Sequence, residues 1–169
     1  MRYYKVADGT TPNLFEIRMA HPEISIPAAG GDLSSLGYET LAEAAKPEAL
    51  PGHRVIEGPV LEVGGVWTSS WLQELLDGTE IMTAIVSATQ ARLDNFAKTR
   101  NYDGILSACT YATSSMPKFL AEGQYCVDAR DATWATLYSI LADVQAGTRT
   151  MPLSFADVEG ELPALAWPA

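Results

Sequence analysis

The spacing of apolar residues along the chain changes character near position 76. Before it, apolar residues form short runs broken by turn-forming residues, as in VLEVGGVW at 60–67. After it, they recur at intervals of three and four, which is the period of one face of an α-helix. This pattern predicts an α+β protein, with a small β-rich module over 1–76 followed by a three- or four-helix bundle over 77–169.

The first strands of the β-rich module are expected close to the N-terminus. Strand-like runs at 2–7 and 14–19 flank a turn-rich stretch over 8–13, where Asp, Gly, Pro and Asn gather. We interpret these two runs as a hairpin. Residues 40–50 are expected to form a brief helix, which Pro51 ends.

The clearest β signal is the pair of glycines at 64–65. A two-residue Gly-Gly loop suits the positive φ angles of a type I′ hairpin turn and would place Val63 opposite Val66. Trp67 and Trp71 lie four residues apart, so they share one face of an extended strand. That face is either the core of the small sheet or an exposed aromatic contact surface, which makes both tryptophans candidate interface residues.

The strongest helix signal begins at Asp77, which forms a capping-box pattern with Glu80. We expect this helix to end near Asn101, because asparagine tolerates a left-handed cap. The apolar positions between them are spaced by four, three, four and three: Met82, Val86, Thr89, Leu93 and Phe96.

Two further helical segments are expected, at 103–114 and from Ser115 to Gly147. Ser115 is the predicted cap of the second, Pro117 suits its first turn, and Gly123 is a candidate break within it. A short helix after Ser154 then precedes LPALAWPA, whose prolines require an extended backbone. The predicted core of the helical domain is Leu93, Phe96, Cys109, Cys126, Trp134, Leu137 and Ile140.

Composition and charge narrow the classes of partner. The net charge is −10, only 19% of residues are charged, and Lys and Arg form no cluster. A nucleic-acid partner is therefore not expected, since phosphate binding needs clustered basic residues. The 47% hydrophobic content favours burial against other protein chains. No stretch approaches the length of a membrane span and no signal peptide is recognised, so we expect no membrane insertion and a protein made in a cytoplasm.

The stretch from 101 to 134 contains both cysteines and invites a search for chemistry. A cysteine nucleophile needs a base, but the two histidines lie in the other half, and no closely spaced Cys or His pair suggests zinc. We expect Cys109 and Cys126 to be reduced and packed between helices. Asp128 and Asp131 are expected on a solvated face, with an ion pair to Arg100 as an alternative. We therefore predict no catalytic residue, no metal and no cofactor.

Several short motifs in the helical half resemble those of tail-fibre and tail-fibre assembly proteins of tailed bacteriophages. The similarity covers about 80–168, with a weaker one before it in HPEISIP and EGPVLEVGGVW. The residues that carry it are Arg100, Tyr102, Asp103, Ser107, Ala108, Cys109, Glu122, Gly123, Arg130, Asp131 and Trp134.

This resemblance implies a non-enzymatic protein of the virion tail, a structural subunit of the tail fibre or its baseplate attachment. Its partners would be other phage tail proteins in an oligomeric assembly. Leu165 and Trp167 are then expected to dock on a neighbouring subunit, as further candidate interface residues. The alternative within the same family is a tail-fibre assembly chaperone. A remote alternative is an envelope-acting hydrolase, which would need His21, His53, Asp128 and Asp131 as its titratable groups.

Overall fold

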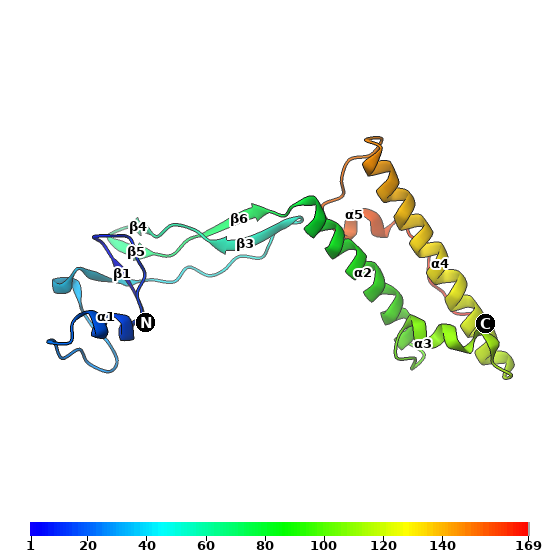
Figure 1. Cartoon of the computed structure of the whole chain (residues 1–169), viewed down its shortest axis with the longest axis horizontal. Coiled ribbons are helices and arrows are strands. Elements are labelled where there is room, and N and C mark those ends of the chain that lie inside the picture. The colour runs from blue at the N-terminus through cyan, green and yellow to red at the C-terminus, as the bar shows by residue number, and fades with distance from the viewer. Residues whose placement is uncertain (169) are drawn as a thin grey trace. The chain divides into compact units, whose positions relative to one another are not determined.

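The computed structural model describes residues 1–168, and the chain divides into two compact units (Figure 1). One unit is Met1–Leu75 and the other begins at Leu76, one residue before the predicted boundary. The first unit carries the strands and the second carries the long helices. The predicted α+β class is confirmed.

The N-terminal unit is built from three separate two-stranded antiparallel sheets, in which β1 pairs with β2, β3 with β6 and β4 with β5. The hairpin at the two glycines is confirmed: Val63 lies opposite Val66, and Gly64 and Gly65 have φ angles of 60° and 80°. The elements are β1 Arg2–Lys5, α1 Leu14–Ala20, a 3₁₀ turn η1 Ser34–Leu36, β2 Tyr38–Leu41, β3 His53–Glu57, β4 Leu61–Val63, β5 Val66–Thr68 and β6 Trp71–Leu75.

The predicted hairpin of 2–7 with 14–19 is wrong, because the second run is the helix α1. A capping box starts this helix: the Asn13 side chain accepts hydrogen bonds from the backbone amides of Phe15 and Glu16, and the Glu16 carboxylate accepts one from the Asn13 amide. β1 instead pairs with β2, so that Arg2 lies opposite Leu41. Local capping therefore outweighs the strand propensity of this run.

The brief helix predicted over 40–50 is also wrong. Its first residues end β2, and the rest runs without regular structure. Side chains of the following strand region hold this backbone instead: Ser69 accepts a hydrogen bond from the Ala44 amide, and Gln73 accepts one from the Leu50 amide. Because these amides have side-chain partners, the segment has no need of helical hydrogen bonds.

The helical unit is an antiparallel pair of long helices with shorter pieces packed on it. Ile81 and Ile85 at the start of α2 pack with Leu137 and Ile140 near the end of α4, so the two helices run in opposite directions. The elements are α2 Gly78–Lys98, α3 Ile105–Cys109, a 3₁₀ helix η2 Thr110–Thr113, α4 Pro117–Gln145 and α5 Ala156–Glu159.

The predicted ends of the long helices are largely confirmed. Asp77 and Glu80 form the capping box of α2, and Asn101 adopts a left-handed conformation with φ of 64°. Gly147, with φ of 72°, follows α4. The cap of α4 is Met116 rather than Ser115, with Pro117 in the first turn as predicted.

Two details of the helix interiors differ from prediction. The buried positions of α2 are Ile81, Ile85, Thr89, Leu93 and Ala97, so Val86 is exposed and Met82 and Phe96 are half-buried. The buried residues are spaced by four, so each lies about 40° further around the helix than the one before it. The buried stripe therefore winds around α2 and meets different neighbouring elements along the length of the helix. Gly123 does not break α4, which is continuous over 29 residues.

Gly123 is present because another backbone passes directly over it. A Cβ at this position would collide with the backbone of Tyr111 and Ala112 in η2. Glycine removes that obstacle and lets η2 lie against α4. The same contact explains why the residue is tolerated in the interior of a helix, where glycine is otherwise unfavourable.

Two buried apolar clusters form the core of the helical unit. One joins α2, α4 and α5 and contains Leu137, Ile140 and Val158. The other joins α2, α3 and α4 and contains Leu93 and Cys126. Trp134 packs against both, and Cys109 and Phe96 are half-buried.

Candidate functional site

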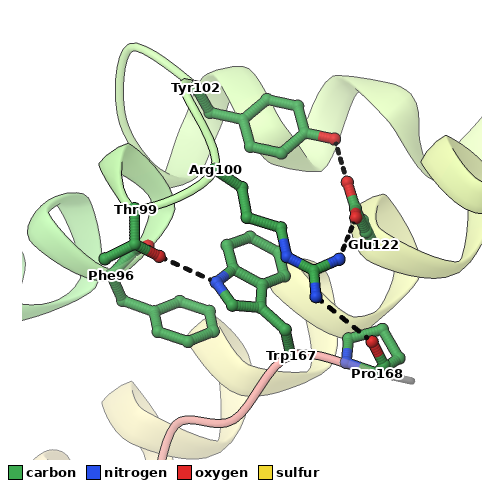
Figure 2. A network of polar contacts seen from close by, with 7 residues as sticks. All are labelled: Phe96, Thr99, Arg100, Tyr102, Glu122, Trp167 and Pro168. Atoms are coloured by element: carbon green, nitrogen blue, oxygen red, sulfur yellow. Dashed lines mark hydrogen bonds and ion pairs between the residues drawn. The ribbon is translucent and has the colours of Figure 1, made fainter.

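A buried carboxylate, Glu122 on α4, organises the polar interior of the helical unit (Figure 2). Its side chain is only 3% exposed and forms an ion pair with Arg100, which follows α2. The other oxygen accepts a hydrogen bond of 2.7 Å from the Tyr102 hydroxyl. Both partners come from the turn that connects α2 to α3, so Glu122 fixes that turn on α4.

The network shifts the pKa of both Glu122 and Tyr102. Burial opposes ionisation of Glu122, but the hydrogen bonds from Tyr102 and Arg100 outweigh it, and the pKa of the carboxyl lies below its usual value. Burial and the hydrogen bond to Glu122 raise the pKa of Tyr102 to about 12. Glu122 is therefore ionised and Tyr102 neutral near pH 7, which is the state that keeps the network closed.

The C-terminal segment packs on this network. The Trp167 ring stacks on Phe96 with 4.3 Å between ring centroids, and its Nε1 donates a hydrogen bond of 2.9 Å to the Thr99 hydroxyl (Figure 2). The Arg100 guanidinium lies 5.0 Å from the same ring, and Leu165 packs against the neighbouring cluster.

The docking of Leu165 and Trp167 on a neighbouring subunit stays a prediction, and within the single chain both residues have partners of their own. Both are seated on their own helical unit, so the segment needs no second chain to hold it. An indole buries a large apolar area and also needs an acceptor for its N–H, and Thr99 and Phe96 together supply both. The expected ion pair between Arg100 and an aspartate is corrected, since Arg100 pairs with Glu122.

In the N-terminal unit, Trp67 and Trp71 are half-buried and each has an internal partner. The Trp67 ring lies 4.5 Å from that of Tyr4, between ring centroids. The Trp71 indole donates a hydrogen bond of 2.9 Å to the Ala44 carbonyl and lies under the Lys46 ammonium. Both tryptophans therefore hold the unit together, and the exposed surface of this region lies elsewhere.

The largest exposed apolar surface of the hairpin is the opposite face of β4 and β5, which we call the hairpin face. It consists of Leu61, Val63 and Val66, whose exposed fractions are 49%, 62% and 49%. Glu62 and Trp67 point to the other side because side chains alternate along a strand. The alternation Leu-Glu-Val in the sequence already places Leu61 and Val63 on one face of the strand, opposite to that of Glu62.

The candidate titratable groups have local partners within their own units. His21 Nε2 lies 3.2 Å from the Tyr38 hydroxyl, and His53 Nδ1 lies 2.8 Å from the Pro51 carbonyl oxygen. Asp131 pairs with Arg130. Within residues 1–168, no group of three or more His, Cys, Asp and Glu side chains is placed to hold a metal ion.

Both cysteines are free thiols with structural positions. Burial raises the pKa of Cys126 to about 11, with a smaller contribution from Cys109. Burial also raises the pKa of Cys109. Raised values disfavour the thiolate, which is the nucleophilic form, so the environment of neither cysteine activates it.

No family model matches the chain, and neither does any curated protein or any solved structure. Among the helices formed by residues 1–168, none has the length and apolar character needed to cross a membrane.

Proposed function

We propose that this chain is a non-enzymatic tail protein of a tailed bacteriophage, a structural subunit of the tail fibre or its baseplate attachment. The observation that carries the proposal is the hairpin face, where Leu61, Val63 and Val66 remain exposed side by side. Exposed apolar side chains grouped on one face of a small unit are typical of a protein–protein contact surface. The resemblance of the helical half to tail-fibre proteins supplies the biological setting.

The organisation of the two units supports an attachment role. The helical unit completes its own core and seats its own C-terminal segment, so it suits a rigid body. The N-terminal unit has a small core and three sheets of two strands each, and a two-stranded sheet has outer backbone edges with which another chain can pair, although that of β5 bonds to Ala42. We therefore assign partner binding to the N-terminal unit.

The residues behind the resemblance support a shared fold more directly than a shared activity. Arg100, Tyr102 and Glu122 bond to one another, and Gly123 admits the backbone of η2. Trp134 joins the two apolar clusters. These are the positions on which the packing of the helical unit depends, and they fit a structural protein without requiring catalysis.

A tail-fibre assembly chaperone is the second candidate, because the hairpin face also suits transient binding of a fibre subunit. The test is quantitative mass spectrometry of purified phage particles, comparing this chain with the sheath and fibre subunits. A fixed copy number that matches the tail's symmetry supports the structural role. Abundance in the infected lysate combined with absence from the particle would replace it with the chaperone.

A further inference from the structure

An extended segment after α5 is bound along the helical unit through its backbone and its side chains, and we call the surface that holds it the groove. We call residues 163–168 the strap. Its backbone is bound directly: the Pro163 carbonyl accepts a hydrogen bond of 2.8 Å from Arg92, and the Ala166 amide donates one of 2.8 Å to the Tyr125 hydroxyl. The strap forms no helix or strand of its own.

Side chains add specificity to this backbone recognition. Trp167 lies among three aromatic rings of the unit, stacking on Phe96 and lying within 6.2 Å of Tyr102 and Tyr125 between centroids. Its indole N–H is matched by Thr99. The groove thus binds an apolar residue and a tryptophan two positions apart on an extended backbone. Peptide-binding grooves recognise their ligands in the same way.

The fit is incomplete at the end of the strap that is tethered to α5. Nη1 of Arg92 is buried and has no hydrogen-bond partner among the described residues, although Nη2 binds the Pro163 carbonyl. A buried donor without an acceptor is unfavourable, because it has lost its hydrogen bonds to water. Arg92 is therefore the least complete of the contacts that hold the strap, whichever copy supplies the strap.

From these contacts we infer that the strap is exchangeable and that the groove accepts the strap of a second copy of this chain. Groove and strap are encoded in the same sequence, so every additional copy supplies a segment with the same complementarity. The strap follows Leu162, which lies with Val158 in the cluster that joins α2, α4 and α5, so the strap can leave without disturbing that cluster. Reciprocal exchange then gives a symmetric dimer by the low-cost route of domain swapping.

The prolines at both ends of the strap favour the exchange. Pro163 and Pro168 restrict the free segment to extended conformations, so it loses little entropy when it binds again. In one molecule the strap is favoured by its high effective concentration, and in a dense assembly neighbouring copies compete with it. This inference does not depend on the proposed function in a phage tail.

The first test measures binding of the strap in trans. A chain truncated after Leu162 presents an empty groove, and the probe is a fluorescent peptide with the sequence LPALAWP, followed by anisotropy. We expect saturable binding to the truncated chain that is at least tenfold tighter than binding to the full chain, whose own strap competes. A Trp167→Ala version of the peptide is the control and should not bind. A folded truncated chain that fails to bind LPALAWP overturns the inference.

The second test asks whether a second copy can be the donor. The donor is the full chain with Phe96→Ala and Thr99→Ala, which keeps its strap but damages its groove, and the acceptor is the truncated chain. Light scattering after size exclusion should show a 1:1 complex in the mixture and monomers alone, with no complex when the donor also carries Trp167→Ala. Peptide binding without a donor–acceptor complex would overturn exchange between copies.

Truncation could also unfold the acceptor, which circular dichroism would reveal. In that case the acceptor is the full chain with Leu165→Ala and Trp167→Ala, which retains the backbone of the strap but neither anchor. Both tests are then repeated with this acceptor, using the same peptide and the same donor. The results that support or overturn the inference are unchanged. Failure of particle incorporation would bear on the proposed function alone, because both tests here use the purified protein.

Discussion

The two units of this protein bury their apolar side chains to very different extents. The helical unit encloses two connected clusters and even seats its own C-terminus. The N-terminal unit encloses one small cluster around Tyr3 and Ile17, while Leu61, Val63 and Val66 stay in solvent. Both units contain apolar residues, so they differ in how much apolar surface each can bury. A unit made of two-stranded sheets has too few layers to cover both faces.

The units also differ in how they use polar groups. In the helical unit, buried Glu122 links two side chains from the turn after α2 and so replaces water with fixed partners. In the N-terminal unit, Ser69, Trp71 and Gln73 bind the irregular backbone over 44–50 through their side chains. The first arrangement stabilises the interior of the helical unit, and the second fixes the irregular segment 44–50 to the strand region that follows it. The contrast predicts where substitutions affect stability and where they affect binding.

The largest effect is expected from truncating a fully buried side chain of the helical unit. Leu93→Ala should lower the free energy of unfolding by roughly 2 to 5 kcal/mol, because the cavity cannot collapse fully. Denaturant unfolding followed by far-ultraviolet circular dichroism measures it. Leu106→Ala is the matched control, since Leu106 is exposed and on the same unit. Equal losses for the two variants would contradict the assigned core.

Removing the buried carboxylate should come next. Glu122→Gln is expected to lower the free energy of unfolding by roughly 1.5 to 3 kcal/mol at pH 7, since it leaves Arg100 and Tyr102 without a charged acceptor. The pKa of Glu122 is lowered by folding, so its contribution is present above the unfolded value of 4.5 and is lost as the pH falls below it.

The pH dependence separates this charge effect from simple loss of packing. Stability curves of the native chain and of Glu122→Gln should therefore converge as the pH falls below 4.5. Glu161→Gln, on an exposed ion pair with Arg149, is the control and should change stability far less. Parallel curves for the native chain and Glu122→Gln at all pH values would show that the carboxylate charge contributes nothing.

A smaller loss is expected where η2 crosses α4. Gly123→Ala should destabilise the helical unit by roughly 1 to 3 kcal/mol through overpacking, although alanine is the better helix former. Gly160→Ala is the control, because a Cβ there meets no atom within 4 Å. Thermal unfolding of the two variants gives the comparison. A Gly123→Ala protein as stable as the native one would mean that the backbones are not in contact.

The smallest effect on stability, combined with a large effect on binding, is expected at the hairpin face. Val63→Ser with Val66→Ser should change the free energy of unfolding by less than about 0.5 kcal/mol, because both side chains are exposed already. Incorporation into phage particles, measured by mass spectrometry after complementation of a deletion, should fall at least tenfold. Val6→Ser, an exposed change in the same unit, should be incorporated normally. Normal incorporation of the double variant would remove the hairpin face as the contact surface.

The sequence by itself determined the features that depend on neighbouring residues. The α+β class, the capping box at Asp77, the left-handed Asn101 and the glycine hairpin at 64–65 all follow from local backbone chemistry. Such signals act within a few residues, so no knowledge of the rest of the chain is needed to recognise them.

Only the tertiary structure decided the features that depend on distant partners. An aspartate was only the alternative partner considered for Arg100, which pairs with Glu122 instead, and the segment containing Trp167 folds back onto Phe96. Gly123 was a candidate break until the backbone of η2 explained it. Periodicity identifies a helix face but not which element covers it, because coverage depends on the packing of residues far apart in the sequence.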